Sequence, residues 1–398
     1  HKTWLREFYS APLTSGERGQ DLPDGDRRDY NRICGLSLRE AVDQLFESEA
    51  IRLFFCLRAI EITGDVGLGA RAAVSDYPGT ADFVFRLAFD PEYQILVGGT
   101  NELAQGISRL IQSLGGAVLT GSPVVQILVR DRKAVGVRLA DGRTIDARAV
   151  VSAGNFVPTM LNLVGEEHLD AAFVAAVKGL QGSRVGKFDV HLAVSDPPGY
   201  RVPEAREALC LFLGYEGLAD IDTRWREICS GAFPATPAFH CGCTTVHDRG
   251  SAPPGRHTLY LWQFVPVELS RSVTPETEGP YMERILARWR EYTPDLTDAH
   301  IVGRYAYYLN KWTNRQAHPY GGLALSHGQY YNRRPLPECA DYRTPVEGLY
   351  LCGSSSHPGG SVRFAPAYNA AQAVVKDLGV APWWNQELVH GTPLVSAS

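Results

Sequence analysis

The chain lacks several features that would place it in a specialised class of protein. No apolar run reaches the about 18 residues that a transmembrane helix needs, and residues 1–9 lack the charged start and apolar core of a signal peptide. We therefore predict no membrane span, and the cytoplasm is the expected location. The net charge of −5 provides no basic surface, so nucleic acid is not expected as a partner.

The eight cysteines follow no spacing that indicates a disulfide framework or a zinc site. They are scattered through the chain at positions 34, 56, 210, 229, 241, 243, 339 and 352, which is typical of reduced thiols. His240, Cys241, Cys243 and His247 do bring nitrogen and sulfur ligands together in the sequence. Their spacing matches no zinc pattern, and alternate residues of a strand point to opposite faces, so no metal site is predicted.

Periodic apolar segments predict a mixture of helices and strands after a polar, turn-rich lead-in loop over residues 1–36. The clearest helix covers 100–114 and stops at Gly115-Gly116, and a capping box at Ser37 and Glu40 starts another. Asp141-Gly142 is a two-residue hairpin turn. Further helices are expected over 38–46, 51–62, 169–177, 279–292 and 366–378, and strands over 117–119, 124–129, 134–139, 145–151, 187–194, 208–213, 257–264 and 348–353.

The segment from Gly348 to Gly360 carries the strongest chemical signal. A short apolar strand stops at Gly353, small residues follow it, and a helix begins near Pro366. Such a connection lets backbone N–H groups and a helix N-terminus approach a phosphate or a flavin carbonyl without interference from side chains. An ordinary strand-turn-helix connection is the alternative interpretation of this segment taken alone.

Together with four other stretches in order, this segment resembles the phytoene desaturase, carotenoid isomerase and related bacterial FAD-dependent oxidoreductases. Those stretches are 98–103 at the start of the clearest helix, 121–127, 140–142 with 147–152, and 333–335 with 342–345. The resemblance covers nearly all of the chain after residue 36, and it implies FAD as the cofactor. By it, the backbone of Val124 would hold the adenine end of FAD, and the pyrophosphate and flavin would lie along Gly353, Ser354, His357, Gly359, Gly360, Ser361 and Val362.

The resemblance also implies the fold class, which is α/β and α+β: an incomplete two-domain FAD-dependent oxidoreductase with a Rossmann-like cofactor domain and a mixed-sheet substrate domain. The expected parts are a lead-in loop (1–36), helices of the substrate domain (37–95), the helix and β-meander of the FAD domain (96–154), the substrate domain (155–335), the closing strand and helix of the FAD domain (336–380) and a C-terminal tail (381–398).

The sequence departs from this family at the dinucleotide-binding motif. The family begins with a strand, a Gly-x-Gly-x-x-Gly turn and a helix, and nothing equivalent precedes residue 37. The nearest match, at 67–72, lacks a preceding β run and a following ribose-binding acid. We therefore predict that a second polypeptide carries the FAD-binding half, giving a heterodimer, or that this half lies outside the present sequence.

A second departure concerns the residues expected to do chemistry. Arg363 and Phe364 are bulky where the family is small, so they either line the reaction pocket, with Arg363 as an anion anchor, or mark a non-catalytic relative. His327 is a candidate base within an aromatic-rich region that either walls a substrate pocket or is simply core. That region contains Tyr305, Tyr307, Tyr308, Trp312, Tyr320, Tyr330 and Tyr331.

The function that this resemblance implies is that of a subunit of a flavin-dependent dehydrogenase, oxidase or desaturase. Such an enzyme oxidises an organic small molecule by hydride transfer to FAD. The alternatives are a non-catalytic structural or regulatory subunit, a redox-neutral FAD-dependent isomerase, and a protein that binds apolar ligands with Phe364 in the place of the flavin.

Overall fold

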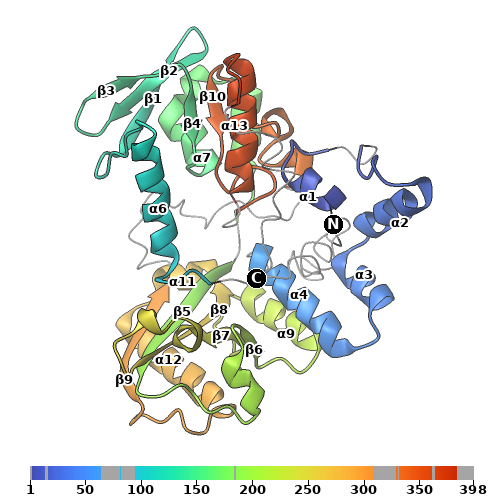
Figure 1. The fold of residues 1–398 in the computed structure, drawn as a ribbon, viewed down its shortest axis with the longest axis vertical. Helices are drawn as coiled ribbons and strands as arrows, with labels where there is room; N and C mark the ends of the chain where they lie inside the picture. Colours follow the sequence, from blue (N-terminus) through green and yellow to red (C-terminus); the bar gives the residue numbers. More distant parts are fainter. Residues whose placement is uncertain are drawn as a thin grey trace. The chain divides into compact units, whose positions relative to one another are not determined.

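The computed structural model describes residues 2–13, 17–63, 81, 95–182, 185–308, 329, 331–360 and 364–382. The chain forms two compact units. Unit 1 contains 1, 19–121 and 181–327, and unit 2 contains 2–18, 122–180 and 328–398. Both units are therefore assembled from segments that are far apart in the sequence, as the colours of Figure 1 show.

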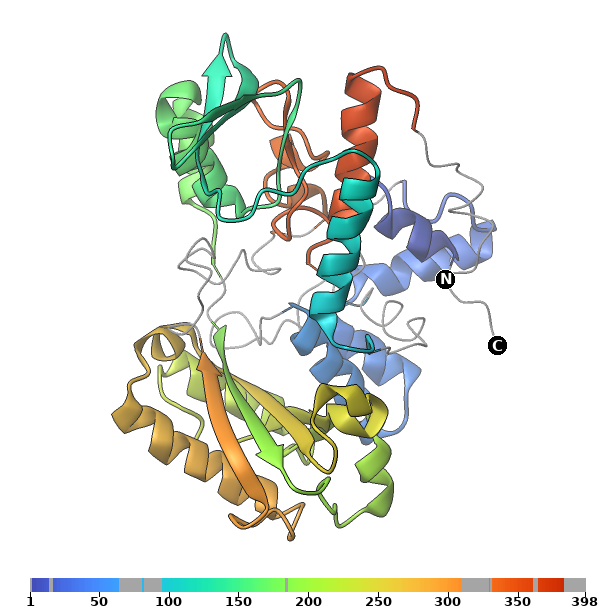
Figure 2. The same cartoon turned by 60° about the vertical axis from the view of Figure 1, so that its left-hand side comes forward.

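Unit 1 is built on a five-stranded antiparallel sheet with helix α12 (Pro275–Arg290) along one face (Figures 1 and 2). The strands, in their order across the sheet, are β6 (Leu211–Leu213), β7 (Phe239–Cys243), β8 (His257–Pro266), β5 (Val185–Val194) and β9 (Ile301–Tyr308). The central strands β8 and β5 pair over their whole length.

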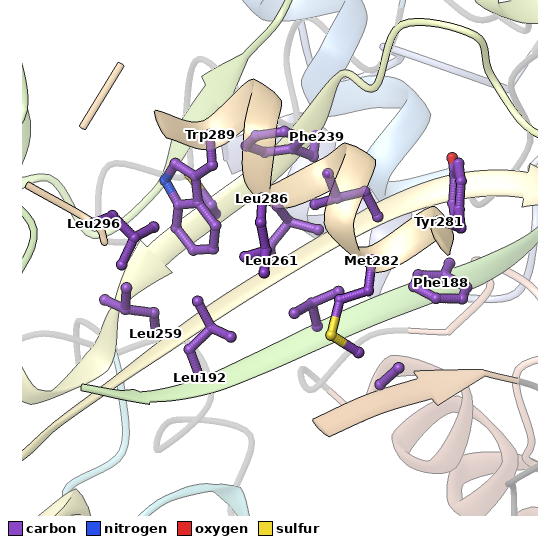
Figure 3. Packing of buried hydrophobic residues seen from close by; sticks show 14 of the residues in the cluster. Phe188, Leu192, Phe239, Leu259, Leu261, Tyr281, Met282, Leu286, Trp289 and Leu296 are labelled. Atoms are coloured by element: carbon purple, nitrogen blue, oxygen red, sulfur yellow. The ribbon is translucent and has the colours of Figure 1, made fainter. Parts of the chain in front are cut away.

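Alternation along β5 decides which face of this sheet becomes core. Phe188, Val190 and Leu192 are buried in one core cluster with Tyr281 and Trp289 of α12, and Figure 3 shows Phe188 beside Tyr281. Each large apolar side chain that is fully buried in this way contributes about 1.5–3 kcal/mol. The intervening residues of β5 point to the other face of the sheet, because successive side chains of a strand alternate.

The other described helices of unit 1 are α2 (Asp24–Gly35), α3 (Leu38–Leu45), α4 (Glu49–Thr63), α6 (Thr100–Ser113), α9 (Leu218–Cys229), α10 (Thr244–His247) and α11 (Val267–Ser272). The predicted capping box at the start of α3 is confirmed, because Ser37 Oγ accepts from the Glu40 backbone N–H. The predicted stop of α6 is also confirmed, and the Gly116 N–H donates to the Ile111 carbonyl there. No residue of α6 is buried, and Leu114 just after it is 68% exposed.

Unit 2 contains an antiparallel meander and a short parallel pair of strands. Strands β1 (Val124–Arg130), β2 (Lys133–Leu139) and β3 (Thr144–Asp146) form the meander, and β4 (Val150–Ser152) pairs in parallel with β10 (Leu349–Leu351). Helix α13 (Ala365–Asp377) packs against β10. Shorter helical segments are α1 (Lys2–Phe8), α7 (Phe156–Pro158), a π-helical turn (Thr159–Gly165) and α8 (Ala171–Lys178).

The structure corrects the lead-in loop predicted over residues 1–36, because this stretch contains helices α1 and α2. Its first part is anchored by contacts with the distant Asn369 and by an ion pair within the stretch itself. Asn369 Nδ2 donates to the carbonyls of Phe8 and Ser10, and Glu7 and Arg18 form a buried ion pair at 3.0 Å. The polar, turn-rich composition of this stretch predicts a loop. Composition alone cannot reveal the tertiary contacts that hold it in place.

Two further predictions differ in detail. Residues 117–119 form no strand, and the run at 145–151 divides into β3 and β4, which belong to different sheets. The helix and meander expected together over 96–154 fall on either side of the unit boundary at 121. Within the described part of the chain, no helix has the length and apolar character needed to cross a bilayer.

Candidate functional site

The predicted cofactor-contacting turn follows a point where two parallel strands end side by side. Ser152 of β4 is in register with Leu351 of β10, and the Cys352 N–H donates to the Ser152 carbonyl at 2.9 Å. Gly353 comes next, and a Cβ atom there would lie only 2.5 Å from the Ala153 carbonyl oxygen. Only glycine fits this position, because the backbone at Gly353 lies directly against the backbone at Ala153.

Hydrogen bonds from both sides fix the turn over residues 353–360. Arg334, which is buried, donates to the Ser354 carbonyl at 2.7 Å. Ser355 Oγ accepts from the Phe156 backbone N–H at 3.2 Å. Gly359 has φ +95°, in the region that favours glycine, and its N–H donates to the Ser356 carbonyl. The turn is therefore held in one shape by its surroundings.

His357 lies inside unit 2, with only 2% of its surface exposed. Burial lowers the pKa of its imidazole to about 3, and the positive charges of Arg334 and Arg18 act in the same direction. The ring is therefore neutral near pH 7. The His357 carbonyl accepts from the Tyr342 hydroxyl at 3.1 Å, so this residue ties the turn to unit 2 through its backbone.

The start of α13 is suited to an anionic group. Its N-cap, Phe364, has left-handed backbone angles (φ +57°) and provides no side-chain cap, although N-terminal N–H groups need an acceptor. Ser356 Oγ is buried and has no hydrogen-bond partner within the described residues. A phosphate or flavin oxygen would satisfy such groups, so the residues present fit the cofactor implied by the sequence. Phe364 itself is 46% exposed, which does not match a ring filling the place of a flavin.

The remaining predicted site residues lie in the meander, in the turn itself or outside the described residues. Val124 begins β1 in the meander, opposite Leu139. Gly360 belongs to the turn, and a Cβ atom on it would meet the Ser354 Cβ at 3.1 Å. His327, Ser361, Val362 and Arg363 lie outside the described residues, as do Trp312, Tyr320, Tyr330 and the glycine-rich stretch 67–72.

A second group of polar and aromatic side chains includes His240, Tyr305 and Tyr307, which the sequence singled out separately, and Lys187, Asp189 and Trp262, which it did not. It occupies the face of the unit 1 sheet that points away from α12. One cross-strand row on this face, in register from strand to strand, consists of Phe212, His240, Trp262, Asp189 and Tyr307. We call this surface, together with Lys187, His191, Tyr260, Tyr305 and Phe264, the polar face.

Charged groups on the polar face are poorly hydrated. Burial raises the pKa of Asp189 to about 6, while the nearby Lys187 opposes that shift. Burial likewise lowers the pKa of Lys187, whose Nζ lies 4.1 Å from the centre of the Trp262 ring. His240 stacks on Phe212, and burial lowers its pKa to about 3. The sequence does contain a signal for this face. Along 187–192, lysine, aspartate and histidine alternate with apolar residues.

The predicted aromatic cluster is divided between the two faces of the sheet. Tyr308 lies in the core, whereas Tyr305 and Tyr307 belong to the polar face, and Tyr305 is 52% exposed. In β7, Cys241 and Cys243 face the core and His240 faces the opposite side. The three side chains of this segment therefore do not converge on one point.

Comparisons with known proteins agree with this description. A family profile described as flavin containing amine oxidoreductase matches residues 13–378. One of the subunits of limonene dehydrogenase from Castellaniella defragrans is 27% identical over 73% of this chain and 56% of its own length. A lycopene-forming phytoene desaturase of Pseudescherichia vulneris is 26% identical over 86% of this chain and 66% of its own length. The predicted resemblance is thus confirmed.

Solved structures show the same fold. An oxidoreductase from Methanosarcina mazei matches with a TM-score of 0.57 and 18% identity, over 89% of this chain and 73% of that one. Putrescine oxidase bound to putrescine matches with a TM-score of 0.51 and 16% identity, over 95% and 75%. The predicted fold class and FAD as the cofactor are confirmed. The chain spans 52–66% of the length of the curated relatives described here and of others like them.

Proposed function

Because the chain belongs to the flavin containing amine oxidoreductase family, we propose that it is a subunit of an FAD-dependent dehydrogenase, oxidase or desaturase acting on an organic small molecule. The observation that carries this proposal is the turn over 353–360, with its tight glycine approach, its buried Ser356 hydroxyl and the uncapped start of α13. When bound, FAD supplies the acceptor for a hydride from the substrate.

In this proposal, the chain's own residues bind FAD and hold it in position. Gly353 and Gly360 keep the turn free of side-chain bulk, and Arg334 holds it through the Ser354 carbonyl. We keep the prediction that Phe364, Arg363 and His327 line the reaction site. We also keep the prediction that Val124 contacts the adenine end of FAD. The neutral His357 stabilises the turn from inside and carries no charge toward the cofactor.

We further propose that a second polypeptide supplies the Gly-x-Gly-x-x-Gly half. Three features support a partner. The parallel pair β4–β10 has only two strands among the described residues, and Val151 of β4 is 46% exposed. Helix α6 leaves Leu110 and Ile111 exposed at 55% and 40%. One relative is named as a subunit of a limonene dehydrogenase, so that protein is part of an enzyme with more than one subunit.

An absorbance spectrum run beside a denaturing gel tests this proposal. The chain is purified together with whatever binds it, from cells that also express the neighbouring reading frames. A flavin spectrum with a second band is the expected result. A single band without flavin would contradict both the cofactor site and the partner, and would favour a non-catalytic relative.

A further inference from the structure

The N-terminal segment of unit 2, residues 2–10, is joined by hydrogen bonds to the turn that is predicted to contact the cofactor. Asn369 Nδ2 donates to the Ser10 carbonyl at 3.0 Å and to the Tyr342 hydroxyl at 2.8 Å. The Tyr342 hydroxyl in turn donates to the His357 carbonyl at 3.1 Å. A continuous series of hydrogen bonds therefore runs from the N-terminal segment to the turn, and all of it lies inside unit 2.

The number of hydrogens in this series sets its direction. The two amide hydrogens of Asn369 are taken by their nearest acceptors, the Ser10 carbonyl and the Tyr342 hydroxyl. The single hydroxyl proton of Tyr342 is then left for the His357 carbonyl. Burial raises the pKa of Tyr342, so the hydroxyl keeps this proton near pH 7. Tyr342 therefore accepts from one side and donates to the other, and a shift of either neighbour alters both bonds.

Tyr342 also has a backbone conformation that a tyrosine rarely adopts. Its φ of +73° lies in the left-handed region, and only 1% of its surface is exposed. Strained conformations persist only where the surrounding contacts enforce them, and they are concentrated at functional sites. Here the conformation places the hydroxyl between Asn369 and the His357 carbonyl, so the strained residue is the joint between the segment and the turn.

Helix α13 contacts the N-terminal segment through a second side chain. The Tyr9 ring meets the Tyr368 ring edge to face, with 5.8 Å between the ring centroids. Tyr368 precedes Asn369, and both belong to the N-terminal half of α13, which starts just after the turn. The segment therefore lies against the same end of α13 that is suited to an anionic group.

We propose that the N-terminal segment and the cofactor turn are coupled through Tyr342 and Asn369, which act as positioning residues. Binding of FAD at the turn then tightens the segment, and the docked segment favours the conformation of the turn that binds FAD. The inference rests on the proposed function, because it takes FAD as the ligand of this turn. Coupling between two binding events is reciprocal, so both effects have the same size.

Hydrogen-exchange mass spectrometry of the flavoprotein complex, before and after its FAD is removed, tests the coupling. FAD should slow exchange in peptide 2–10 by about tenfold. Tyr342→Phe keeps the buried ring and the bond between Asn369 and Ser10, but it breaks the link to the turn. This variant should reduce the FAD effect to less than about twofold and weaken FAD binding by about fivefold or more. Asn369→Ala should speed exchange of the peptide in both states.

Tyr350→Phe is the matched control, because it removes another buried tyrosine hydroxyl of unit 2. That hydroxyl donates to Asp377, the last residue of α13, at 2.9 Å. The control should keep the FAD effect at about tenfold, which separates the coupling from a general loss of stability. Loss of the FAD effect in Tyr350→Phe as well would overturn the proposal.

A second comparison needs no flavin. Gly359 has φ +95°, so Gly359→Ala distorts the turn directly. In the flavin-free chain it should speed exchange of peptide 2–10 by about fivefold, and it should have no effect once Tyr342→Phe is present. An equal Gly359→Ala effect in both backgrounds would overturn the proposal.

The two comparisons separate failure of the coupling from failure of the proposed function. If FAD binds without slowing exchange of peptide 2–10, or if Tyr342→Phe retains the FAD effect, the coupling is refuted and the flavoenzyme stands. If no FAD is taken up, the proposed function is refuted, and the Gly359→Ala comparison alone decides whether the segment and the turn are coupled.

Discussion

Replacing Asp189 by asparagine should stabilise the folded chain at neutral pH. The two side chains have nearly the same shape, but asparagine carries no charge that burial could penalise. Asp189 has a folded-state pKa of about 6, against an ordinary value of 3.8 that applies to the unfolded chain. The folded state therefore holds the carboxyl proton more tightly than the unfolded state does.

The sign of the effect follows from proton linkage. A folded-state pKa raised above the unfolded value gives stability that is fully present below pH 3.8 and is lost as the pH rises through about 6. The difference of about two pKa units corresponds to at most about 3 kcal/mol. This figure already includes the attraction between Asp189 and Lys187, and partial exposure reduces it. We expect a gain of about 1–3 kcal/mol for Asp189→Asn above pH 7, falling to near zero at pH 4.

Urea denaturation at a series of pH values between 4 and 8 measures this difference. Both proteins contain His191 and His240, so histidine titration is common to them and cancels in the difference. The unfolding free energies of variant and parent should diverge as the pH rises. A constant difference across the range, or a variant less stable than its parent at pH 8, would show that Asp189 is not a desolvated carboxylate.

Three further predictions concern unit 2 and the partner. Gly353→Ala should destabilise the chain by about 1–3 kcal/mol in urea denaturation and lower its flavin content, because the new Cβ meets the Ala153 carbonyl at 2.5 Å; an unchanged midpoint would argue against the tight approach. Asn369→Ala should lower the free energy of unfolding by about 1–3 kcal/mol and speed proteolysis near residue 10, because it removes the donor to the Phe8 and Ser10 carbonyls. Equal proteolysis of variant and parent would contradict that anchoring. Leu110→Asp on the exposed face of α6 should abolish copurification of a second polypeptide while leaving the stability of the isolated chain within about 0.5 kcal/mol; retained copurification would exclude that face as the docking surface.

Local signals in the sequence were sufficient for many elements of the fold. The capping box at Ser37, the helix stop at Gly115-Gly116 and the Asp141-Gly142 turn each depend on residues close together in the chain. The strand and helix that flank the turn at 353–360 were predicted for the same reason, and the family resemblance made that turn recognisable.

Features that depend on distant contacts could not be predicted in this way. Asn369 donates to the carbonyls of Phe8 and Ser10, which are more than 350 positions away in the sequence. The polar face became visible only when strand register placed His240, Trp262 and Asp189 side by side, because these residues come from three separate strands. The requirement for glycine at position 353 likewise comes from Ala153, which lies just after a strand some 200 residues earlier.

The most direct test of the proposed function is the absorbance spectrum of the chain purified with its coexpressed neighbours, run beside a denaturing gel. The proposal predicts flavin absorbance in the same fractions as two bands, one of them this chain. A single band without flavin absorbance would contradict it, and the turn at 353–360 would then be a structural connection in a protein that does not bind FAD.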